Sequence, residues 1–163
     1  MKKFQHTFLS FIIILIAMIG CKEEIYVYEV NEVVVNPNNS EKDKEKSVPQ
    51  FISILYANIY QKALSPDDLV DISELIASIG DKQIAYETIL AKMITDPEVE
   101  IPTNGEMRAD IEKFVIETYK RFYVRLPTEA EKTYFTNYIE SNPDVTPVLV
   151  YFSFATANEY NYY

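Results

Sequence analysis

The feature that most restricts the fold of this chain is a pattern of apolar and aromatic residues that occurs twice, 63 positions apart. Within each copy the apolar residues recur every three or four positions, which is the period of an α-helix with one buried face. The matching pairs in the first helix of each copy are Phe51 and Phe114, Ile52 and Val115, Tyr56 and Tyr119, Ile59 and Phe122, and Tyr60 and Tyr123. The sequence therefore predicts two similar helical units.

Signals for helix starts repeat in the same register. Ser65 and Thr128 are hydroxyl residues suited to the N-cap, and each is followed three positions later by an acid, Asp68 or Glu131. The pairs that continue the spacing on the predicted core stripe of the second helix are Ile72 and Phe135, Leu75 and Tyr138, and Ile76 and Ile139. Near the ends, 95–99 and 156–160 match at a spacing of 61, which the loss of two residues between the second and third helices would explain.

We predict an all-α domain over residues 48–163, a six-helix bundle made of the similar three-helix units 48–99 and 106–163. A three-helix unit alone buries little apolar surface, so the two units are expected to pack as one bundle. The stretch from Asp96 to Gly105 contains two prolines and a glycine and is predicted as a connector. The alternative to duplication is that amphipathic helices match by period alone, in which case the two units should not superpose.

Each unit resembles the phycobilisome-linker-like helical repeat of secreted bacterial proteins. The resemblance rests on an aromatic Tyr-x-x-[Ile/Phe]-Tyr helix and on the turn Arg125-Leu-Pro-Thr-Glu-Ala-Glu131, where the first unit has Lys62-Ala-Leu-Ser-Pro66 instead. Both units lack the glycine before that arginine and the tryptophan often seen in the second helix of such repeats. The resemblance implies a helical, mostly non-catalytic module.

Residues 1–20 have the pattern of a secretory signal peptide. Lys2 and Lys3 precede an apolar run of about a dozen residues, which is shorter than the roughly 20 residues that span a bilayer. Met18-Ile19-Gly20-Cys21 then resembles the lipobox of bacterial lipoproteins, with Met where leucine is commonest. The resemblance implies that Cys21, the only cysteine, carries the lipid. An uncleaved anchor with an incidental cysteine is the alternative.

The three residues that follow the cysteine suggest where the lipoprotein is sent. Lys22-Glu23-Glu24 resembles the Lys-acidic-acidic export signal of surface lipoproteins in the Bacteroidetes. We therefore expect an outer-membrane protein, held by two or more acyl chains and facing the cell exterior. The alternative is a charged start that is merely solvated.

Residues 21–47 are predicted to form a lipidated flexible tether. Residues 25–35 are rich in Val and Tyr, which favours extended structure, and either are disordered or add a strand to the sheet of a partner. Residues 36–47 contain no large apolar side chain and cannot offset the entropy of ordering.

Charge and residue types exclude several functions. After removal of residues 1–20, 13 Lys and Arg face 25 Asp and Glu, so binding to nucleic acid through phosphates is excluded. The only histidine, His6, lies in the predicted signal peptide, which excludes the usual Ser-His, Cys-His and zinc sites. We predict no enzymatic activity, no cofactor and no metal. The acids in first helical turns, which we interpret as caps rather than as catalytic or calcium-binding groups, are Asp67, Asp68, Asp71, Glu129 and Glu131.

The remaining candidates for function are basic and aromatic residues of the second unit. Tyr and Arg are over-represented at binding hot spots. The predicted contacts with a partner are Arg121, Arg125, Tyr160, Tyr162 and Tyr163. The alternative is that the tyrosines close the bundle and the arginines cap helix C-termini. We expect a non-enzymatic accessory subunit of an outer-membrane transport, secretion or assembly complex; the alternative is a surface module that binds a glycan or another ligand.

Overall fold

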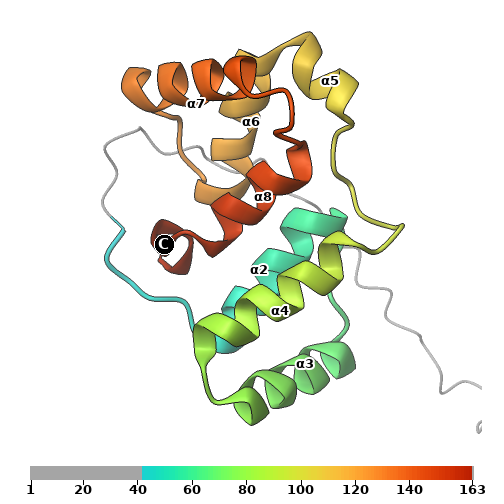
Figure 1. Cartoon of the computed structure of the whole chain (residues 1–163). Coiled ribbons are helices and arrows are strands. Elements are labelled where there is room, and N and C mark those ends of the chain that lie inside the picture. The colour runs from blue at the N-terminus through green and yellow to red at the C-terminus, as the bar shows by residue number, and fades with distance from the viewer. Residues whose placement is uncertain (1–41, 163) are drawn as a thin grey trace, which may run out of the picture. The chain divides into compact units, whose positions relative to one another are not determined.

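The computed structural model describes residues 42–162, and this part of the chain is all-helical, as predicted. The helices are α2 (Val48–Tyr60), α3 (Pro66–Ile79), α4 (Lys82–Ile94), α5 (Asn104–Ala109), α6 (Ile111–Tyr123), α7 (Glu129–Ser141), α8 (Pro147–Thr156) and the 3-10 helix η1 (Asn158–Asn161). None of these helices has the length and apolar character needed to cross a membrane. Figure 1 shows α8 between the pair α6 and α7 and the pair α2 and α4.

The first two helices of each unit keep the 63-residue register at their boundaries. Helices α2 and α6 both begin and end 63 positions apart, and so do the first residues of α3 and α7. The turn between these helices also matches, because Gln61 and Val124 have left-handed φ angles of 53° and 54°. A β-branched valine rarely adopts this conformation, and strain of this kind costs on the order of 1–3 kcal/mol. Because the same left-handed conformation occurs at Gln61 and at Val124, the surrounding fold, and not the residue type at the turn, determines it.

The third helices match at their ends but not at their starts. In both units a tyrosine hydroxyl of the first helix donates to a carbonyl of the third: Tyr60 to Met93 O at 3.5 Å, and Tyr123 to Phe154 O at 3.3 Å. The two acceptors are 61 positions apart, as the sequence predicts. Helix α8 begins late, at Pro147, so its first turn is replaced by the loop that ends at its N-cap, Thr146.

The predicted core stripe of the second helices is wrong at one pair of positions. Leu75 and Tyr138 are 49% and 47% exposed, whereas their neighbours Ile76 and Ile139 are buried. Each residue of a helix turns by about 100°, and α3 and α7 bury a single narrow face, so the residue next to the buried isoleucine points outward. The equal exposure of the two residues nevertheless follows the 63-residue register.

The bundle contains a seventh α-helix that the sequence analysis assigned to the connector and the start of the second unit. Helix α5 has a capping box in which Thr103 and Glu106 satisfy one another's backbone N–H groups. Asp110 then caps the start of α6 with its side chain. Asn104 and Gly105 are poor helix formers, and only the four residues that follow them favour a helix. The Thr-x-x-Glu spacing is therefore the main sequence signal for this short helix.

The two units meet where α4 packs against α8. Aromatic rings continue the core across this junction. Phe51 stacks on Tyr86 of the same unit at a centroid distance of 3.6 Å, and Tyr160 of the second unit meets both Phe51 and Phe122 edge-on at 5.5 and 5.7 Å. The side chain of Tyr160 therefore joins the two cores.

Residues 42–46, which we call the strap, lie against η1 at the end of the chain (Figure 1). The backbone N–H of Lys46 donates to Asn161 O at 2.8 Å, and Glu45 forms an antiparallel bridge with Tyr162. The predicted tether boundary at residue 47 is therefore wrong. The strap is held by backbone hydrogen bonds and lysine contacts instead of apolar burial, and composition alone does not reveal such an attachment.

Candidate functional site

A groove of about 970 Å³ runs between the two units. Its walls come from the end of α2, the connector after α4, helix α5 and the exposed side of α6. The buried apolar side chains at its floor include Met107, Phe114 and Tyr151. Because the groove crosses from one unit to the other, both units contribute to whatever binds there.

The rim of the groove carries charges of both signs. Its basic residues are Lys113, Lys120 and Arg121, and its acidic residues are Glu100, Glu106, Asp110 and Glu117. Lys120 and Glu117 pair with each other at 2.9 Å on the surface, where an ion pair contributes little stability. An apolar floor inside a mixed polar rim is the usual composition of a protein interface.

Arg121 is the predicted contact residue that lines this groove. Its guanidinium donates to Glu100 O at 2.8 Å and lies 5.3 Å from the centroid of the Tyr151 ring. The arginine of α6 therefore holds the connector after α4 against the second unit. Half-buried and stacked on a tyrosine, it has the environment that favours arginine at interfaces.

Arg125, in contrast, belongs to the interior, so its prediction as a partner contact is wrong. It is 6% exposed, and its guanidinium bonds both carboxylate oxygens of Glu131 at 2.8 and 2.9 Å and those of Glu159 at 2.6 and 2.8 Å. It also lies 4.9 Å from the centroid of the Tyr119 ring. Amino-acid composition cannot show this pairing. The spacing of six residues between Arg125 and Glu131 in the turn motif is a sequence signal for the contact with Glu131.

Tyr160 is also buried, and its prediction as a partner contact is wrong as well. It is 0% exposed, and its hydroxyl accepts a hydrogen bond from Asn58 Nδ2 at 2.9 Å. Lys46 of the strap donates to the carbonyl of Tyr160 and lies 4.1 Å above its ring. Burial, with help from the charge of Lys42, lowers the pKa of Lys46 to about 8. A residue near a chain end is thus buried because the strap covers it and its ring packs against Phe51 and Phe122.

Other predicted site residues lie at the edge of the described part or outside it. Tyr162 is half-buried at its bridge with Glu45. Tyr163, the lipidation residue Cys21 and the export signal at 22–24 lie outside the described residues.

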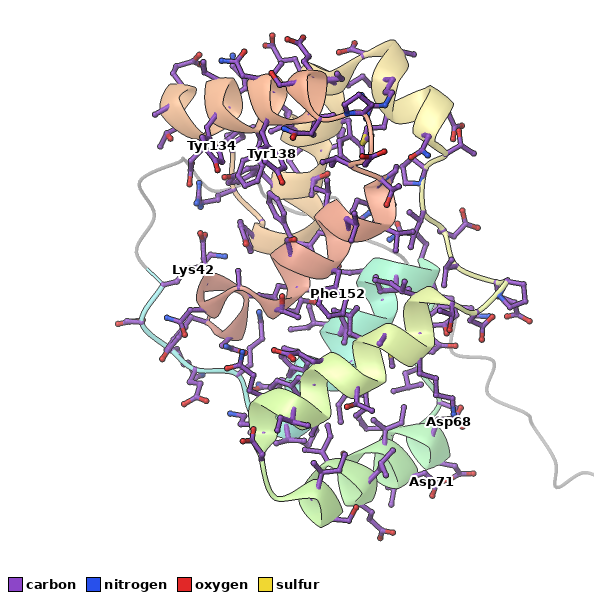
Figure 2. The ribbon with its side chains drawn as sticks, viewed as in Figure 1. Lys42, Asp68, Asp71, Tyr134, Tyr138 and Phe152 are labelled. Carbon is purple, nitrogen blue, oxygen red and sulfur yellow. The ribbon has the colours of Figure 1, made fainter. Side chains whose placement is uncertain are left out.

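Helix α7 carries an exposed aromatic pair that was not predicted from the sequence. Tyr134 is 63% exposed and Tyr138 47%, and their nearly parallel rings lie 6.2 Å apart between centroids (Figure 2). Their spacing of four residues is the only sequence signal for the pair, because Tyr138 also fits the predicted core stripe.

Asp67 and Asp68 lie in the first turn of α3, and Glu129 and Glu131 lie in the first turn of α7, as predicted. Asp71 lies one turn further along α3, so its prediction as a first-turn acid is wrong. The hydroxyls of Ser65 and Thr128 accept hydrogen bonds from the backbone N–H groups of Asp68 and Glu131. Asp68 and Asp71 project from α3 (Figure 2). In the described range 42–162, no group of three or more Asp, Glu, His or Cys residues is placed to hold a metal ion.

The cluster around Arg125 should make stability depend on acid pH. Hydrogen bonds from Arg125 and, next among the favourable contacts, from the backbone of Thr128 lower the pKa of Glu131 to about 2, from an ordinary value of 4.5. A carboxyl group with a lowered folded-state pKa stabilises the fold at pH values above 4.5, and this contribution is lost as the pH falls from 4.5 to about 2. Urea unfolding measured from pH 7 downward should therefore show a steeper loss of stability in the native protein than in Glu131→Gln.

The matched control for this titration is Glu129→Gln, which changes an exposed acid in the same helical turn. It should retain the native pH dependence. Equal pH profiles for the native protein and Glu131→Gln would contradict the assignment of the acid-sensitive contribution to the Arg125 cluster.

Comparison of this chain with protein families, curated proteins and solved structures finds no match to any of the three.

Proposed function

We propose that this chain is a lipid-anchored outer-membrane protein that faces the cell exterior and acts as a non-enzymatic accessory subunit of a membrane protein complex. The observation that carries this proposal is Cys21, which follows Gly20 at the end of a short apolar run. Acyl chains on this residue would hold the domain at the membrane, where a transport, secretion or assembly complex is its natural partner. The export signal at 22–24 directs the domain outward.

The groove between the units is the proposed docking site. It is large enough for a segment of another protein. Arg121 at its rim is of a residue type that is common at binding hot spots, and it lies over the ring of Tyr151. The partner segment would place apolar side chains on the floor at Met107, Phe114 and Tyr151, and would meet the rim with charges of both signs. A rim that carries charges of both signs favours a partner whose charges match it position by position, rather than any protein of opposite net charge.

The proposal is tested by purifying the tagged protein from detergent-solubilised membranes and identifying by mass spectrometry what remains bound. Arg121→Glu reverses a charge at the groove, and Lys92→Glu reverses one at an exposed position of α4 outside it. We expect one membrane complex to be retained at constant stoichiometry by the native protein and by Lys92→Glu. Arg121→Glu should reduce it about tenfold, the usual effect of losing a hot-spot side chain.

Thermal unfolding of both variants shows whether they are folded when tested. If the same proteins are recovered with folded Arg121→Glu as with the native protein, the groove is not the docking site. If no membrane protein is retained in constant proportion by the native protein, the proposed function is wrong.

A further inference from the structure

The charges around the groove between the two units are divided between its two walls. One wall is formed by the connector after α4, by α5 and by the turn that follows it, and its charged residues are all acidic: Glu100, Glu106 and Asp110. The other wall is α6, whose charged residues in the groove are Lys113, Glu117, Lys120 and Arg121. Because Glu117 pairs with Lys120 at 2.9 Å, the net charge of the α6 wall is positive.

These charges do not neutralise one another across the groove. Within residues 42–162 no ion pair joins one wall to the other, and neither Lys113 nor Arg121 is paired with a carboxylate. The two walls therefore offer charges of opposite sign to a molecule that lies between them.

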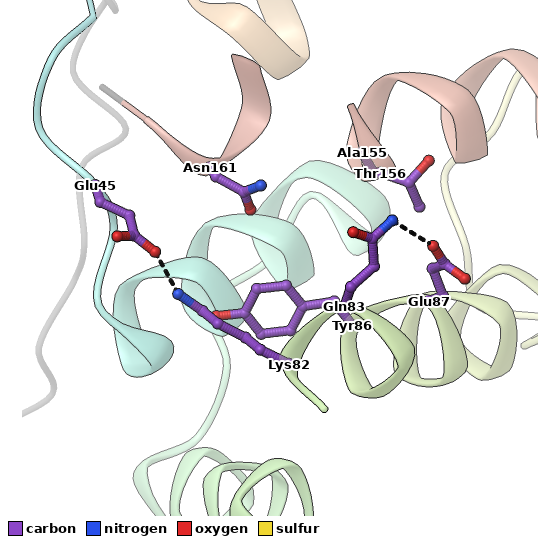
Figure 3. A pocket seen from close by; sticks show the side chains of 8 residues that line it. All are labelled: Glu45, Lys82, Gln83, Tyr86, Glu87, Ala155, Thr156 and Asn161. Carbon is purple, nitrogen blue, oxygen red and sulfur yellow. Dashed lines mark hydrogen bonds and ion pairs between the residues drawn. The ribbon is translucent and has the colours of Figure 1, made fainter. Parts of the chain in front are cut away.

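A smaller cavity, of about 170 Å³, lies among the strap, α4, α8 and η1 and has the opposite arrangement. Lys82 pairs with Glu45 at 2.5 Å, and the amide of Gln83 donates to Glu87 at 2.9 Å (Figure 3). These groups are satisfied by their neighbours in the chain. Of these two cavities, only the groove presents basic side chains that have no acidic partner.

The walls of the groove meet at both of its ends, which sets its length. At one end Arg121 donates to Glu100 O at 2.8 Å. At the other end Asp110 is both the C-cap of α5 and the N-cap of α6. Asp110 and Arg121 are 11 positions apart, which corresponds to about 16 Å along a helix. A bound helix of about three turns has this length, whereas an extended segment needs only about five residues to span it.

The division of charge favours a helix as the bound segment. A segment in the groove faces three directions at once, toward the apolar floor, the acidic wall and the basic wall. Successive side chains of an extended segment point to two opposite faces only. In a helix each residue turns by about 100°, so an apolar stripe can have acidic residues along one edge and basic residues along the other. An amphipathic helix that lays its apolar face into a groove is also a common mode of recognition.

We propose that the groove binds an amphipathic helix of about three turns from the partner protein, with acidic residues along the edge that faces α6 and basic residues along the edge that faces the connector and α5. Its apolar stripe lies over the floor at Phe114 and Tyr151. The inference rests on the proposed function, because it names the kind of segment that the partner supplies. Reversing the direction of the helix would bring each edge against a wall of its own sign, so the helix docks in one direction.

The first test determines which partner residues lie against each wall. A photoreactive amino acid is placed in the full-length protein at position 113, on α6, or at position 100, on the opposite wall. After crosslinking in intact cells, mass spectrometry identifies the partner residues that have reacted. We expect both positions to react with one segment of about 11 residues, at sites three or four residues apart. Acidic residues should flank the sites reached from position 113, and basic residues those reached from position 100.

The second test exchanges the charges of the two walls. Lys113→Glu combined with Glu100→Lys keeps the net charge of the protein, and both side chains are exposed, so the fold should be retained. The amount of partner retained in affinity purification should fall about tenfold, because each edge of the helix then meets a wall of its own sign. The matched control combines Lys92→Glu with Glu140→Lys, two exposed residues outside the groove, and should retain the partner like the native protein.

Three results would overturn the inference: crosslinked sites that are two residues apart or lie in separate segments, edges with the opposite assignment of charge, or undiminished retention by the exchange variant when thermal unfolding shows it to be folded. In each of these cases a partner is still captured, so the proposed function stands and the helix is wrong. If the native protein retains no membrane protein, the proposed function is wrong and the inference falls with it.

Discussion

Replacement of Cys21 by alanine is expected to remove the protein from the membrane fraction. In the proposed lipoprotein, acyl chains on this residue are the anchor, and each buried CH₂ group contributes about 0.8 kcal/mol to membrane binding. The run of about a dozen apolar residues before it is too short to replace them as a span. Cell fractionation should therefore show Cys21→Ala in soluble or unprocessed form, and metabolic labelling with a palmitate analogue should no longer mark it.

The control for this experiment is Met18→Leu, which places the commonest residue at the one position where this sequence departs from the lipobox pattern. It should be labelled and retained in membranes like the native protein. If the analogue still marks Cys21→Ala, lipid is attached elsewhere. If Cys21→Ala is unlabelled but remains in the membrane as a processed protein, the lipid is not the anchor.

Replacement of Tyr160 by alanine is expected to have the largest effect on folding stability, a loss of about 3–5 kcal/mol, as for other fully buried aromatic residues. Its ring contacts Phe51 in one unit and Phe122 in the other. Its hydroxyl accepts from Asn58, and Lys46 of the strap lies over the ring. Loss of the ring leaves a cavity between the two cores and removes the surface on which the strap packs.

Urea unfolding measures this loss directly, with two matched variants. Tyr160→Phe keeps the ring and loses only the hydrogen bond from Asn58, so it should lose about 1 kcal/mol. Tyr162→Ala removes a half-buried tyrosine two positions away and should lose less than Tyr160→Ala. Equal losses for Tyr160→Ala and Tyr162→Ala would show that the end of the chain is not part of the core.

Much of the helical arrangement could be predicted from the sequence because periodicity and capping are local signals. Ser65 and Thr128 occur 63 positions apart and cap α3 and α7 as expected. The left-handed turns at Gln61 and Val124 could not be predicted, since neither residue is a glycine or asparagine. Helix α5 could not be predicted with certainty because it is only six residues long and begins with two weak helix formers, Asn104 and Gly105.

The candidate site was less predictable, since it depends on which side chains meet across the fold. Arg121 and Arg125 are four positions apart on a basic stretch, yet the first lines the groove and the second lies between Glu131 and Glu159. Only the positions of Glu131 and Glu159 in the folded chain explain why the two arginines have different environments.

The central claim, that a lipid-anchored domain holds a partner in its groove, is tested most directly by photo-crosslinking in intact cells. A photoreactive amino acid at position 113 lies on the rim of the groove, and one at position 92 lies on α4 outside it. We predict one dominant adduct with a membrane protein from position 113, none from position 92, and loss of the adduct when Cys21→Ala is added. Absence of an adduct at position 113, or an adduct that persists without Cys21, would contradict the claim.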